Sequence, residues 1–444
     1  MITRTTGRLR QRGSRLCALL LAACCAPAAQ AQGQALVQDG IIIDPVLPFD
    51  FDQGRNTSLR EQVMMENGPL GIRRGTLLIL PRVSTGVGAS NNPFLAGGDP
   101  DGDVFVRVNP SVDVRTDWAR HRLNLNASAV LTRYAREDRL NRTEWNLGAS
   151  GLLNVGDYGT VEAEARVSRV QEEPYTSGLD ASTAILSRFR RGFGALRAAR
   201  QVGRTRFSAT AALEDYSYDD LEAGDGTVIS QGARNRRDWT GAGQAEYAFS
   251  PGAVGYVQGS YVVIDYQLPG TPLAPTRDGQ SWRLLAGLNA DLPGRLRGTI
   301  AAGYTRRSFD DPTYDPVSGF SAQGEVTWFA DPLTNVTLLG RRLLQEAPIG
   351  GDAFFESSAR LSVDRSVRRN LLLGVSGYLG KIEYGRSPVD FRVRQAGASA
   401  EYFAPRWYDV RLGLTWTRRN ARPATIGVAD FDELAALLTL TIHP

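Results

Sequence analysis

The 444-residue sequence has no long apolar run beyond its N-terminus. No later window offers about 18 consecutive apolar residues, which is the length that a transmembrane helix needs. The mean hydropathy of -0.25 is also too polar for a bundle of membrane-spanning helices. These absences exclude a helical membrane protein, but they leave a transmembrane β-barrel open, because half of each barrel strand faces a wet lumen.

Cysteine is confined to one end of the chain. Cys17, Cys24 and Cys25 are the only three, and all lie in the first 31 residues, which we expect to be removed. The remaining chain therefore has no disulfide framework, no thiolate metal site and no thiol nucleophile. Lysine is nearly absent too: Lys381 is the single lysine among 51 basic residues, which we interpret as compositional bias.

Histidine occurs only twice, at His121 and His443. Outer-membrane phospholipases and proteases need a histidine beside a serine or aspartate at the outer rim of the barrel. We expect His121 in a tight turn over 118–121 and His443 beside the C-terminus, both solvated and both away from that rim. The sequence also has no zincin motif, P-loop or Gly-x-Ser-x-Gly elbow. We therefore predict no catalytic residue and no enzymatic activity.

The N-terminus has the features of an export signal. A basic segment with five arginines precedes the apolar run Leu16–Ala23, and Ala29-Gln30-Ala31 is a small-residue cleavage site. Residues 1–31 are thus predicted to be a cleaved signal peptide. The alternative is lipidation at Cys24, since Leu21–Cys24 is similar to a lipobox.

Removal of this segment changes the formal charge from +4 to -1, because it carries five arginines and no acidic residue. The basic pI therefore belongs mainly to the signal peptide. We predict no nucleic-acid partner.

Between residues 83 and 442, eighteen segments of alternating apolar and polar residues follow one another. The gaps after even-numbered segments are tight turns, for example at 250–252, 293–294, 331–332 and 404–405. The gaps after odd-numbered segments are long and polar, for example at 171–187, 216–237 and 419–432. This pattern predicts an all-β fold: a transmembrane antiparallel up-and-down β-barrel of about 18 strands (16 being the alternative), with short periplasmic turns and long extracellular loops.

The segments are about 10 to 15 residues long, which exceeds the 5 to 6 typical of soluble strands and suits tilted membrane-crossing strands. Aromatic residues recur near the segment ends, where the two interfacial girdles of a barrel would lie. The candidates for these girdles are Trp118, Tyr134, Trp145, Trp239, Phe249, Tyr266, Trp282, Tyr304, Trp328, Phe403, Tyr408 and Trp416.

Residues 32–75 lack this alternation and contain Pro45, Pro48 and Pro69. We interpret them as a periplasmic N-terminal extension with a helical turn at Ser58–Met65, too short for a folded plug domain. Residues 76–444 form the predicted barrel. An even number of strands places both termini on one side, which we predict to be the periplasm. The chain ends Ile442-His443-Pro444, without the terminal aromatic residue common in outer-membrane proteins.

One face of each segment is polar and is predicted to line the lumen. Its charges have both signs, which argues against a strongly ion-selective pore; they can equally pair across strands and stabilise the wall. A register slip of one residue would reverse these assignments. The candidate lumen-lining residues are Arg115, Arg122, Glu162, Arg166, Glu246, Arg283, Arg297, Glu325, Glu356, Arg360 and Arg411.

Three loops are acidic: 99–103, 219–222 and 310–311. Carboxylates at alternate positions suit Ca²⁺, but the full spacing of an EF-hand is absent. Solvated aspartate-glycine turns are the favoured interpretation. We therefore predict no metal site and no cofactor.

The start of the predicted barrel resembles a known family. Pro69–Gly75, Leu80–Gly88 and Asn91–Phe94 are similar to the lead-in, first strand and first turn of the β-barrel porin type 2 family. In the turn, only the final Asn92 and Phe94 agree with that family. The resemblance implies an outer-membrane barrel, and some relatives are linked to exopolysaccharide or capsule production.

These observations lead to hypotheses from different classes. The first is a porin-like outer-membrane channel that passes small polar solutes or a glycan. The second is a conduit or accessory for exopolysaccharide or capsule export. A non-conducting structural barrel, an outer-membrane enzyme and a soluble β-sandwich or propeller fit less well, since no blade repeat of about 40–50 residues is present. The expected partners are outer-membrane lipids, lipopolysaccharide, the barrel-assembly machinery and, under the second hypothesis, polysaccharide export components.

Overall fold

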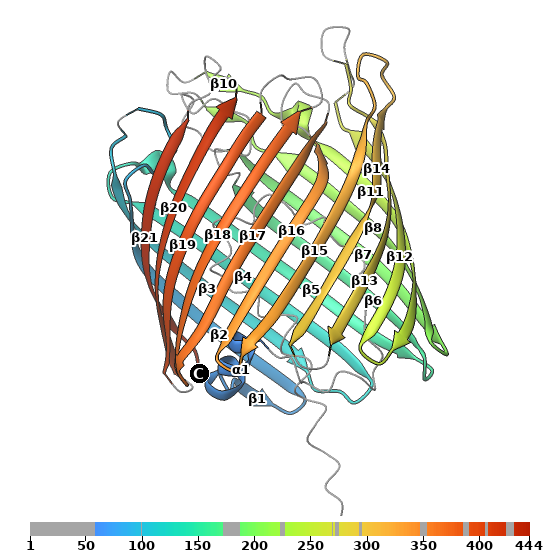
Figure 1. Ribbon diagram of the computed structural model, residues 1–444. Helices are drawn as coiled ribbons and strands as arrows, with labels where there is room; N and C mark the ends of the chain where they lie inside the picture. The colour runs from blue at the N-terminus through green and yellow to red at the C-terminus, as the bar shows by residue number, and fades with distance from the viewer. Residues whose placement is uncertain are drawn as a thin grey trace, which may run out of the picture. The chain divides into compact units, whose positions relative to one another are not determined.

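Eighteen antiparallel strands close into a barrel in a computed structural model of the chain (Figure 1). Each barrel strand pairs with its neighbour in the chain, and β2 pairs with β21 to close the ring. The sheet has nineteen strands in all because the short β1 also pairs with β2. The predicted barrel of 18 rather than 16 strands is therefore confirmed.

The structure describes residues 58–444 except 99, 172–186, 223–226, 269, 271–274, 293–294, 347–352, 385–389, 405–406 and 423–429. The predicted signal peptide, the lipobox and most of the N-terminal extension lie outside the described residues. The described residues all belong to one compact unit, Asp39–Pro444. In the described part of the chain, no helix is long and apolar enough to cross a membrane.

The barrel strands are 12 to 16 residues long. Their bounds are β2 (Leu77–Ser90), β3 (Asp103–Thr116), β4 (His121–Tyr134), β5 (Arg142–Val155), β6 (Gly159–Gln171), β7 (Arg188–Val202), β8 (Thr205–Tyr218), β11 (Arg236–Ser250), β12 (Ala253–Tyr266), β13 (Gly279–Leu292), β14 (Leu296–Phe309), β15 (Val317–Asp331), β16 (Thr334–Glu346), β17 (Ala353–Arg368), β18 (Leu371–Tyr384), β19 (Asp390–Ala404), β20 (Tyr408–Arg422) and β21 (Phe431–Ile442).

The smaller elements lie at the two ends of the barrel. They are the helix α1 (Leu59–Asn67), β1 (Ile72–Arg74), the hairpin of β9 (Leu221–Glu222) and β10 (Val228–Ile229), and the 3₁₀ turns at Asp138–Leu140 and Gly232–Arg234. The helical turn predicted at Ser58–Met65 is confirmed as α1. A capping box starts this helix, because the Ser58 hydroxyl accepts from the Glu61 N–H and the Glu61 carboxylate accepts from the Ser58 N–H.

Long and short connections alternate around the barrel, as the spacing of the segments predicts. Short turns such as 117–120 and 203–204 gather at one end, together with α1, β1 and the C-terminus. The strand ends that border the long connections, such as Ser90 and Tyr266, gather at the other end. We refer to these as the short-turn end (bottom of Figure 1) and the long-loop end.

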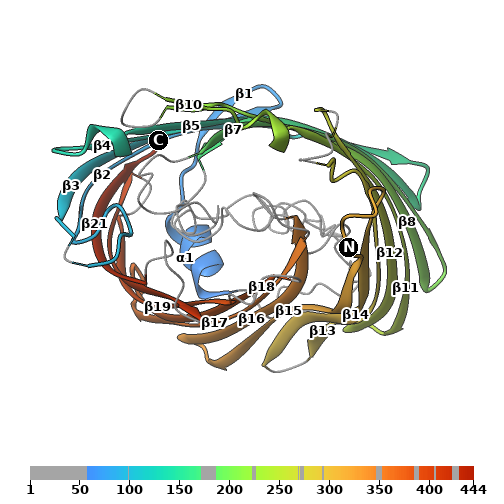
Figure 2. The ribbon, with the colours of Figure 1, turned by 90° about the horizontal axis from the view of Figure 1, so that it is seen from above.

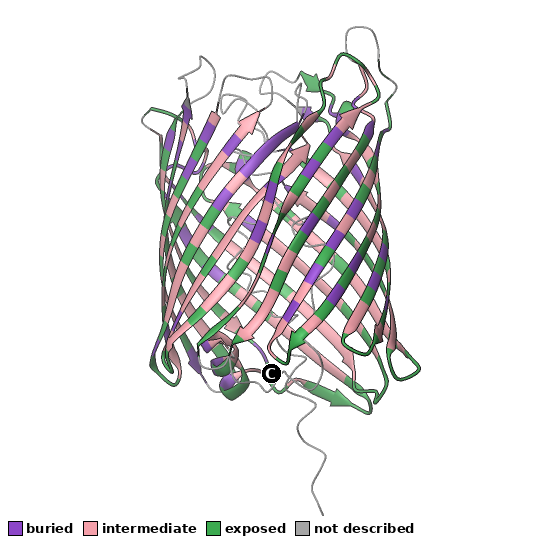
Figure 3. Ribbon diagram, turned by 45° about the vertical axis from the view of Figure 1, so that its right-hand side comes forward, coloured by how far each residue is buried: buried purple, intermediate pink, exposed green. Residues whose placement is uncertain are grey.

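Exposed residues alternate with less exposed ones along the barrel strands (Figure 3). The large exposed side chains are apolar and face outward, whereas the residues between them are largely polar and face inward. On β2, Val83 and Val87 are 47% and 62% exposed, whereas Ser84 between them hydrogen-bonds across the strand pair to Thr441. A closed ring leaves no unpaired strand edge, which a membrane interior would not tolerate.

Exposed aromatic residues form two bands on the outer face. Near the long-loop end they include Trp239, Tyr261, Trp282, Tyr304, Phe320 and Trp416. Near the short-turn end they include Trp118, Phe207, Tyr247, Phe249, Trp328, Tyr402, Trp407 and Tyr408. Three assignments to these girdles were wrong: Tyr134, Tyr266 and Phe403 lie on inner faces. Each lies on the face opposite the exposed apolar or aromatic residues of its own strand. Tyr134 stacks against Phe105 there, and Phe403 is only 1% exposed.

Candidate functional site: the lumen and its two narrowed ends

The eleven candidate lumen residues all lie on strand faces opposite the exposed apolar residues. Trp282 and Leu284 are exposed on β13, for example, so Arg283 between them faces inward. The eleven do not form one cluster. They are distributed over β3, β4, β6, β11, β13, β14, β15, β17 and β20, at all heights of the wall.

Most of the charge pairing on the inner wall joins neighbouring strands. Glu162 pairs with Arg197 at 3.1 Å, and Glu356 pairs with Arg341 at 3.3 Å. Cross-strand pairs of this kind stabilise a sheet by fractions of a kcal/mol, about 0.2–1. The inner wall therefore presents alternating charges of both signs rather than a ring of one sign.

At the long-loop end, the hairpin of β16 and β17 leaves the wall. β15 pairs with β16 only from Ala322 onward, whereas β16 and β17 continue to pair up to Glu346 and Ala353. Figure 2 shows the ends of these strands inside the ring. The back of the hairpin packs on the inner wall: a Cβ on Gly319 of β15 would lie 3.0 Å from the Phe355 ring, so a small residue is needed there. The alternation of β17 places Phe355 on the same side as the exposed Leu361, but Phe355 is 7% exposed because its hairpin bends inward.

Glu346, at the end of β16, anchors this hairpin to two other strands of the barrel wall, β14 and β12. Its carboxylate accepts from the Arg307 Nε of β14 at 2.6 Å and from the Tyr266 hydroxyl of β12 at 3.0 Å. Arg307 is 1% exposed, and its Nη2 also donates to the Arg277 carbonyl at 2.6 Å. A buried guanidinium with several hydrogen bonds holds its partner in a defined place. The contact therefore fixes a narrowing at the long-loop end.

Aromatic rings stacked with arginines line the same end of the barrel. The arginine carbon lies 4.2 Å from the Tyr216 ring centre for Arg236, and 4.4 Å from the Phe309 ring centre for Arg307. We call this set the inner collar. Its members are Phe105, Phe189, Tyr216, Tyr218, Tyr266, Phe309, Phe354, Tyr384, Phe391 and Phe431, with Arg107, Arg191, Arg234, Arg236, Arg277, Arg307 and Arg419.

The inner collar is packed rather than open. Phe354 and Phe431 are each 4% exposed, and Arg419 lies between the rings of Phe391 and Phe431, at 5.5 and 5.0 Å. Arg191 donates twice to Glu214, from Nη2 at 2.7 Å and from Nε at 3.1 Å. In a partly desolvated environment, cation–π and charge-assisted contacts each stabilise the folded state by about 2 kcal/mol. The collar thus stiffens the rim at the long-loop end.

At the short-turn end, α1 lies within the ring of strands, against β17 and β19 (Figure 2). Leu59 and Val63 pack on Leu372 and Phe403, and all four are at most 5% exposed. Arg60 forms an ion pair with Glu401 on the inner wall at 2.5 Å. A helix with its side chains is about 10–12 Å across, so α1 takes up a substantial part of the opening.

The second histidine is placed differently from the expectation. His443 is 2% exposed rather than solvated, and its Nε2 lies 3.0 Å from an Asp409 carboxylate oxygen on the inner face of β20. Two backbone hydrogen bonds hold the C-terminus against the short-turn end. The Pro444 carbonyl accepts from the Gly71 N–H, and the His443 N–H donates to the Trp407 carbonyl. His121 starts β4 at the short-turn end and is exposed.

The acidic loops use their carboxylates to hold nearby backbone. Asp103 accepts from the N–H groups of Arg136 and Glu137 at 3.1 and 2.9 Å, and Asp220 accepts from that of Gln231. Hydrogen bonds from Thr313 lower the pKa of Asp311. Within the described ranges, no group of three or more potential ligands could hold a metal ion.

Sequence reasoning did not identify Glu346, Arg307, Tyr266 or Arg60 as functional candidates. Alternation places Glu346 on the outward side of β16 but does not show that its hairpin bends into the barrel, and Tyr266 was assigned to an outer girdle. The recurrence of an aromatic residue and an arginine near the long gaps was the available signal for the collar. From the sequence, the aromatic residues near the segment ends were all assigned to the two outer girdles.

Comparisons with known proteins identify the type of barrel. The family model described as "Putative beta-barrel porin 2" matches residues 67–443. Among solved structures, the chain is similar to Pseudomonas aeruginosa OccK2 (OpdF) in complex with glucuronate, at 11% identity and a TM-score of 0.47, covering 83% of this chain and 98% of that one.

Two further structures show the same level of similarity. They are P. aeruginosa OccK1 (OpdK), at 10% identity and a TM-score of 0.45 over 82% of this chain and 99% of that one, and a bacterial polysaccharide outer membrane secretin, at 10% identity and a TM-score of 0.38 over 82% and 98%. These likenesses concern the barrel fold alone. A search of curated proteins by sequence finds no match.

Proposed function

The chain belongs to the beta-barrel porin 2 family of outer-membrane channels, and on that premise we propose that it passes small polar solutes through a lumen narrowed at both ends. In this proposal the long loops face the outside, and both termini face the periplasm. The usual arrangement of bacterial barrels, with short periplasmic turns and longer outside loops, supports this orientation.

The observation that carries the proposal is the polar inner wall of a ring of eighteen strands. A ring of this size encloses an aqueous channel unless something fills it. The inward hairpin and α1 each narrow the channel from one side, so they would limit the size of the solute. The mixed charges of the wall predict weak selectivity between anions and cations.

The test is single-channel conductance of the refolded protein in planar bilayers, with heat-modifiable gel mobility as the check of folding. Steady ohmic openings with a permeability ratio for K⁺ and Cl⁻ near one support the proposal. A correctly folded barrel that never conducts would contradict it.

A second candidate function is passage of an acidic glycan, as a conduit or accessory of polysaccharide export. The half-buried aromatic residues of the inner collar, such as Phe189, Tyr218 and Phe309, favour it, because aromatic faces stack on sugar rings and arginines pair with carboxylates. Block of the current by uronic-acid oligosaccharides, but not by neutral ones of equal length, would support it. Unchanged polysaccharide secretion in a deletion strain would count against it.

A further inference from the structure

The outer face of β18, β19 and β20 changes from apolar to basic near the long-loop end. On β20 the outward residues are Leu412, Leu414 and Trp416, all exposed, and the next outward residue is Arg418. The exposed Leu379 of β18 is likewise followed by Lys381. The exposed apolar residues therefore end at Leu379 on β18 and at Trp416 on β20, and on each strand a basic residue is the next one to face outward.

The strand register brings these basic residues together. Arg394 pairs with Arg418, and Lys381 pairs with Arg392. Paired residues of adjacent strands lie about 5 Å apart, and next-but-one residues on a strand lie about 7 Å apart. We call Lys381, Arg392, Arg394 and Arg418 the basic wall patch.

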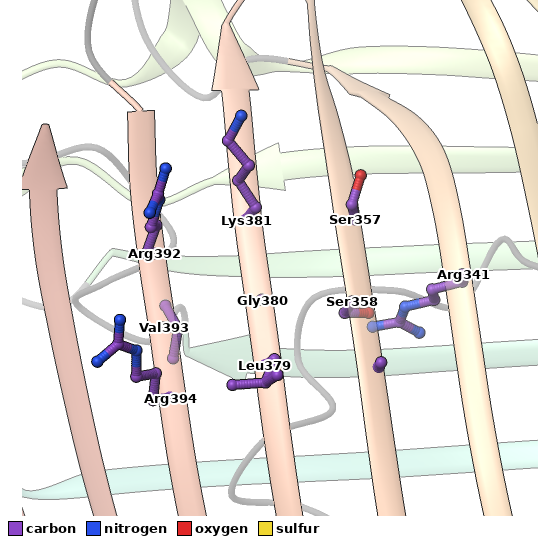
Figure 4. Close-up of a pocket in the computed structure, with 10 residues that line it drawn as sticks. Arg341, Ser357, Ser358, Leu379, Gly380, Lys381, Arg392, Val393 and Arg394 are labelled. Carbon is purple, nitrogen blue, oxygen red and sulfur yellow. The ribbon is translucent and has the colours of Figure 1, made fainter.

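The patch borders a hollow of about 430 Å³ (Figure 4). On the outward face its lining includes the apolar Ala359 and Leu379 below and the cationic side chains above. Its remaining lining lies at inner-face positions of β16 to β19 and comes from Arg341, Ser358, Gly380 and Val393. Figure 4 shows Lys381 and Arg392 both extending toward the long-loop end. The outward side of the hollow thus has an apolar part below and a cationic rim on the loop side.

The charges of the patch are only partly neutralised. Lys381 pairs with Glu383 at 2.5 Å and Asp390 at 3.2 Å, and Arg418 lies 3.8 Å from Asp432. Arg392 and Arg394 are exposed, and neither forms an ion pair with any part of the chain that the structure describes. Two guanidinium groups on one strand face are suited to hold a phosphate by several charge-assisted hydrogen bonds.

We propose that the basic wall patch binds the phosphate groups of lipid A, the membrane anchor of lipopolysaccharide, with an acyl chain in the hollow below. Arginine on a lipid-facing wall is costly within the hydrocarbon layer and is tolerated at its border. Lipid A places phosphates at that border, directly above its acyl chains. The proposal rests on the orientation given under the proposed function, in which the long loops face the outer leaflet.

The test compares binding of three lipids to the delipidated, refolded protein in detergent, by native mass spectrometry. The lipids are bis-phosphorylated lipid A, its dephosphorylated form and phosphatidylglycerol. The variant is Arg392→Ala with Arg394→Ala. The matched control is Arg188→Ala with Arg190→Ala on β7, an exposed pair with the same spacing at the same end of the barrel.

We expect bis-phosphorylated lipid A to bind best, with a loss of about ten-fold or more in the β19 variant and less than about two-fold in the β7 control. Equal binding of the dephosphorylated lipid would overturn the proposal, as would equal losses in both variants. Preference for phosphatidylglycerol would overturn it too, by showing that the patch faces a phospholipid leaflet. Conductance of the same variants separates this result from the channel function, because the patch lies outside the lumen.

Discussion

The two ends of the barrel are narrowed in different ways. At the long-loop end, the wall itself supplies the obstruction: a hairpin of β16 and β17 is bound through Glu346 to a buried arginine and a tyrosine. At the short-turn end, the obstruction is a separate helix held by four apolar side chains and one ion pair. The first is continuous with the sheet and embedded in the inner collar, whereas the second has a small contact area. The comparison indicates that α1 is the part more easily displaced.

The largest effect is expected from removing the anchor of the hairpin. Glu346→Ala leaves the 1%-exposed Arg307 without its carboxylate partner, and an unpaired buried charge of this kind costs about 3–5 kcal/mol. The hairpin should detach, so single-channel conductance should rise and become noisy. Glu346→Gln keeps the shape and an oxygen acceptor for Tyr266 but removes the charge that pairs with Arg307, so its channels should fall between those of the native protein and the alanine variant. Unchanged, quiet channels in the alanine variant would show that the hairpin does not narrow the pore.

The second-largest effect is expected at the apolar contact that holds α1 against the barrel wall. Phe403→Ala removes a ring that is 1% exposed and packs on the helix, at a cost of about 3 kcal/mol or more. Trypsin should then cleave at Arg60 in the folded barrel, which can be followed by gel and mass spectrometry. Tyr402→Ala, on the outer face of the same strand, should leave this site protected. Equal cleavage of both variants would mean that the helix does not depend on Phe403.

A smaller effect is expected for the ion pair that holds α1. A double-mutant cycle of Arg60→Ala and Glu401→Ala should give a coupling of about 1 kcal/mol in the rate of cleavage after Glu66 by a glutamate-specific protease, since both side chains of the pair are only partly exposed. Neither substitution removes that cleavage site. A coupling near zero would leave the apolar contacts as the sole attachment of the helix.

The smallest effect is expected from a single charge of the inner wall, close to the short-turn end. Arg297 and Glu325 lie on neighbouring strands of the inner wall, where charges of both signs alternate. Arg297→Gln should therefore change the permeability ratio for K⁺ and Cl⁻ by less than about two-fold. Reversal potentials in a salt gradient measure this ratio, and a shift of several-fold would reveal a dominant charge at that position.

Much of the fold was predictable because the sequence of each barrel strand shows by itself which residues lie on each face of the sheet. Alternation with a period of two assigns each residue to one of two faces, and the lengths of the gaps assign the turns to the two ends. The closure and the strand number followed from counting such segments. The polar faces that would line the lumen could be read in the same way.

The lumen's narrowed ends could not be read in this way. Alternation states that Phe355 and Glu346 lie on the outward side of their strands, and locally they do. Because the hairpin bends into the barrel, that outward side faces another part of the inner wall. Tyr134, Tyr266 and Phe403 were misassigned for a related reason: an aromatic residue at a strand end suits a lipid interface and a packed rim equally well.

The sequence by itself thus determined an outer-membrane barrel of eighteen strands, its two faces and its two unlike ends. These properties depend on residues that are close along the chain, so their pattern is visible without the fold. Only the tertiary structure decided where the lumen narrows, because the contacts of Glu346 with Tyr266 and of α1 with Phe403 join residues 80 or more positions apart. Contacts between such distant residues produce no repeating pattern in the sequence, and they form only once the ring has closed.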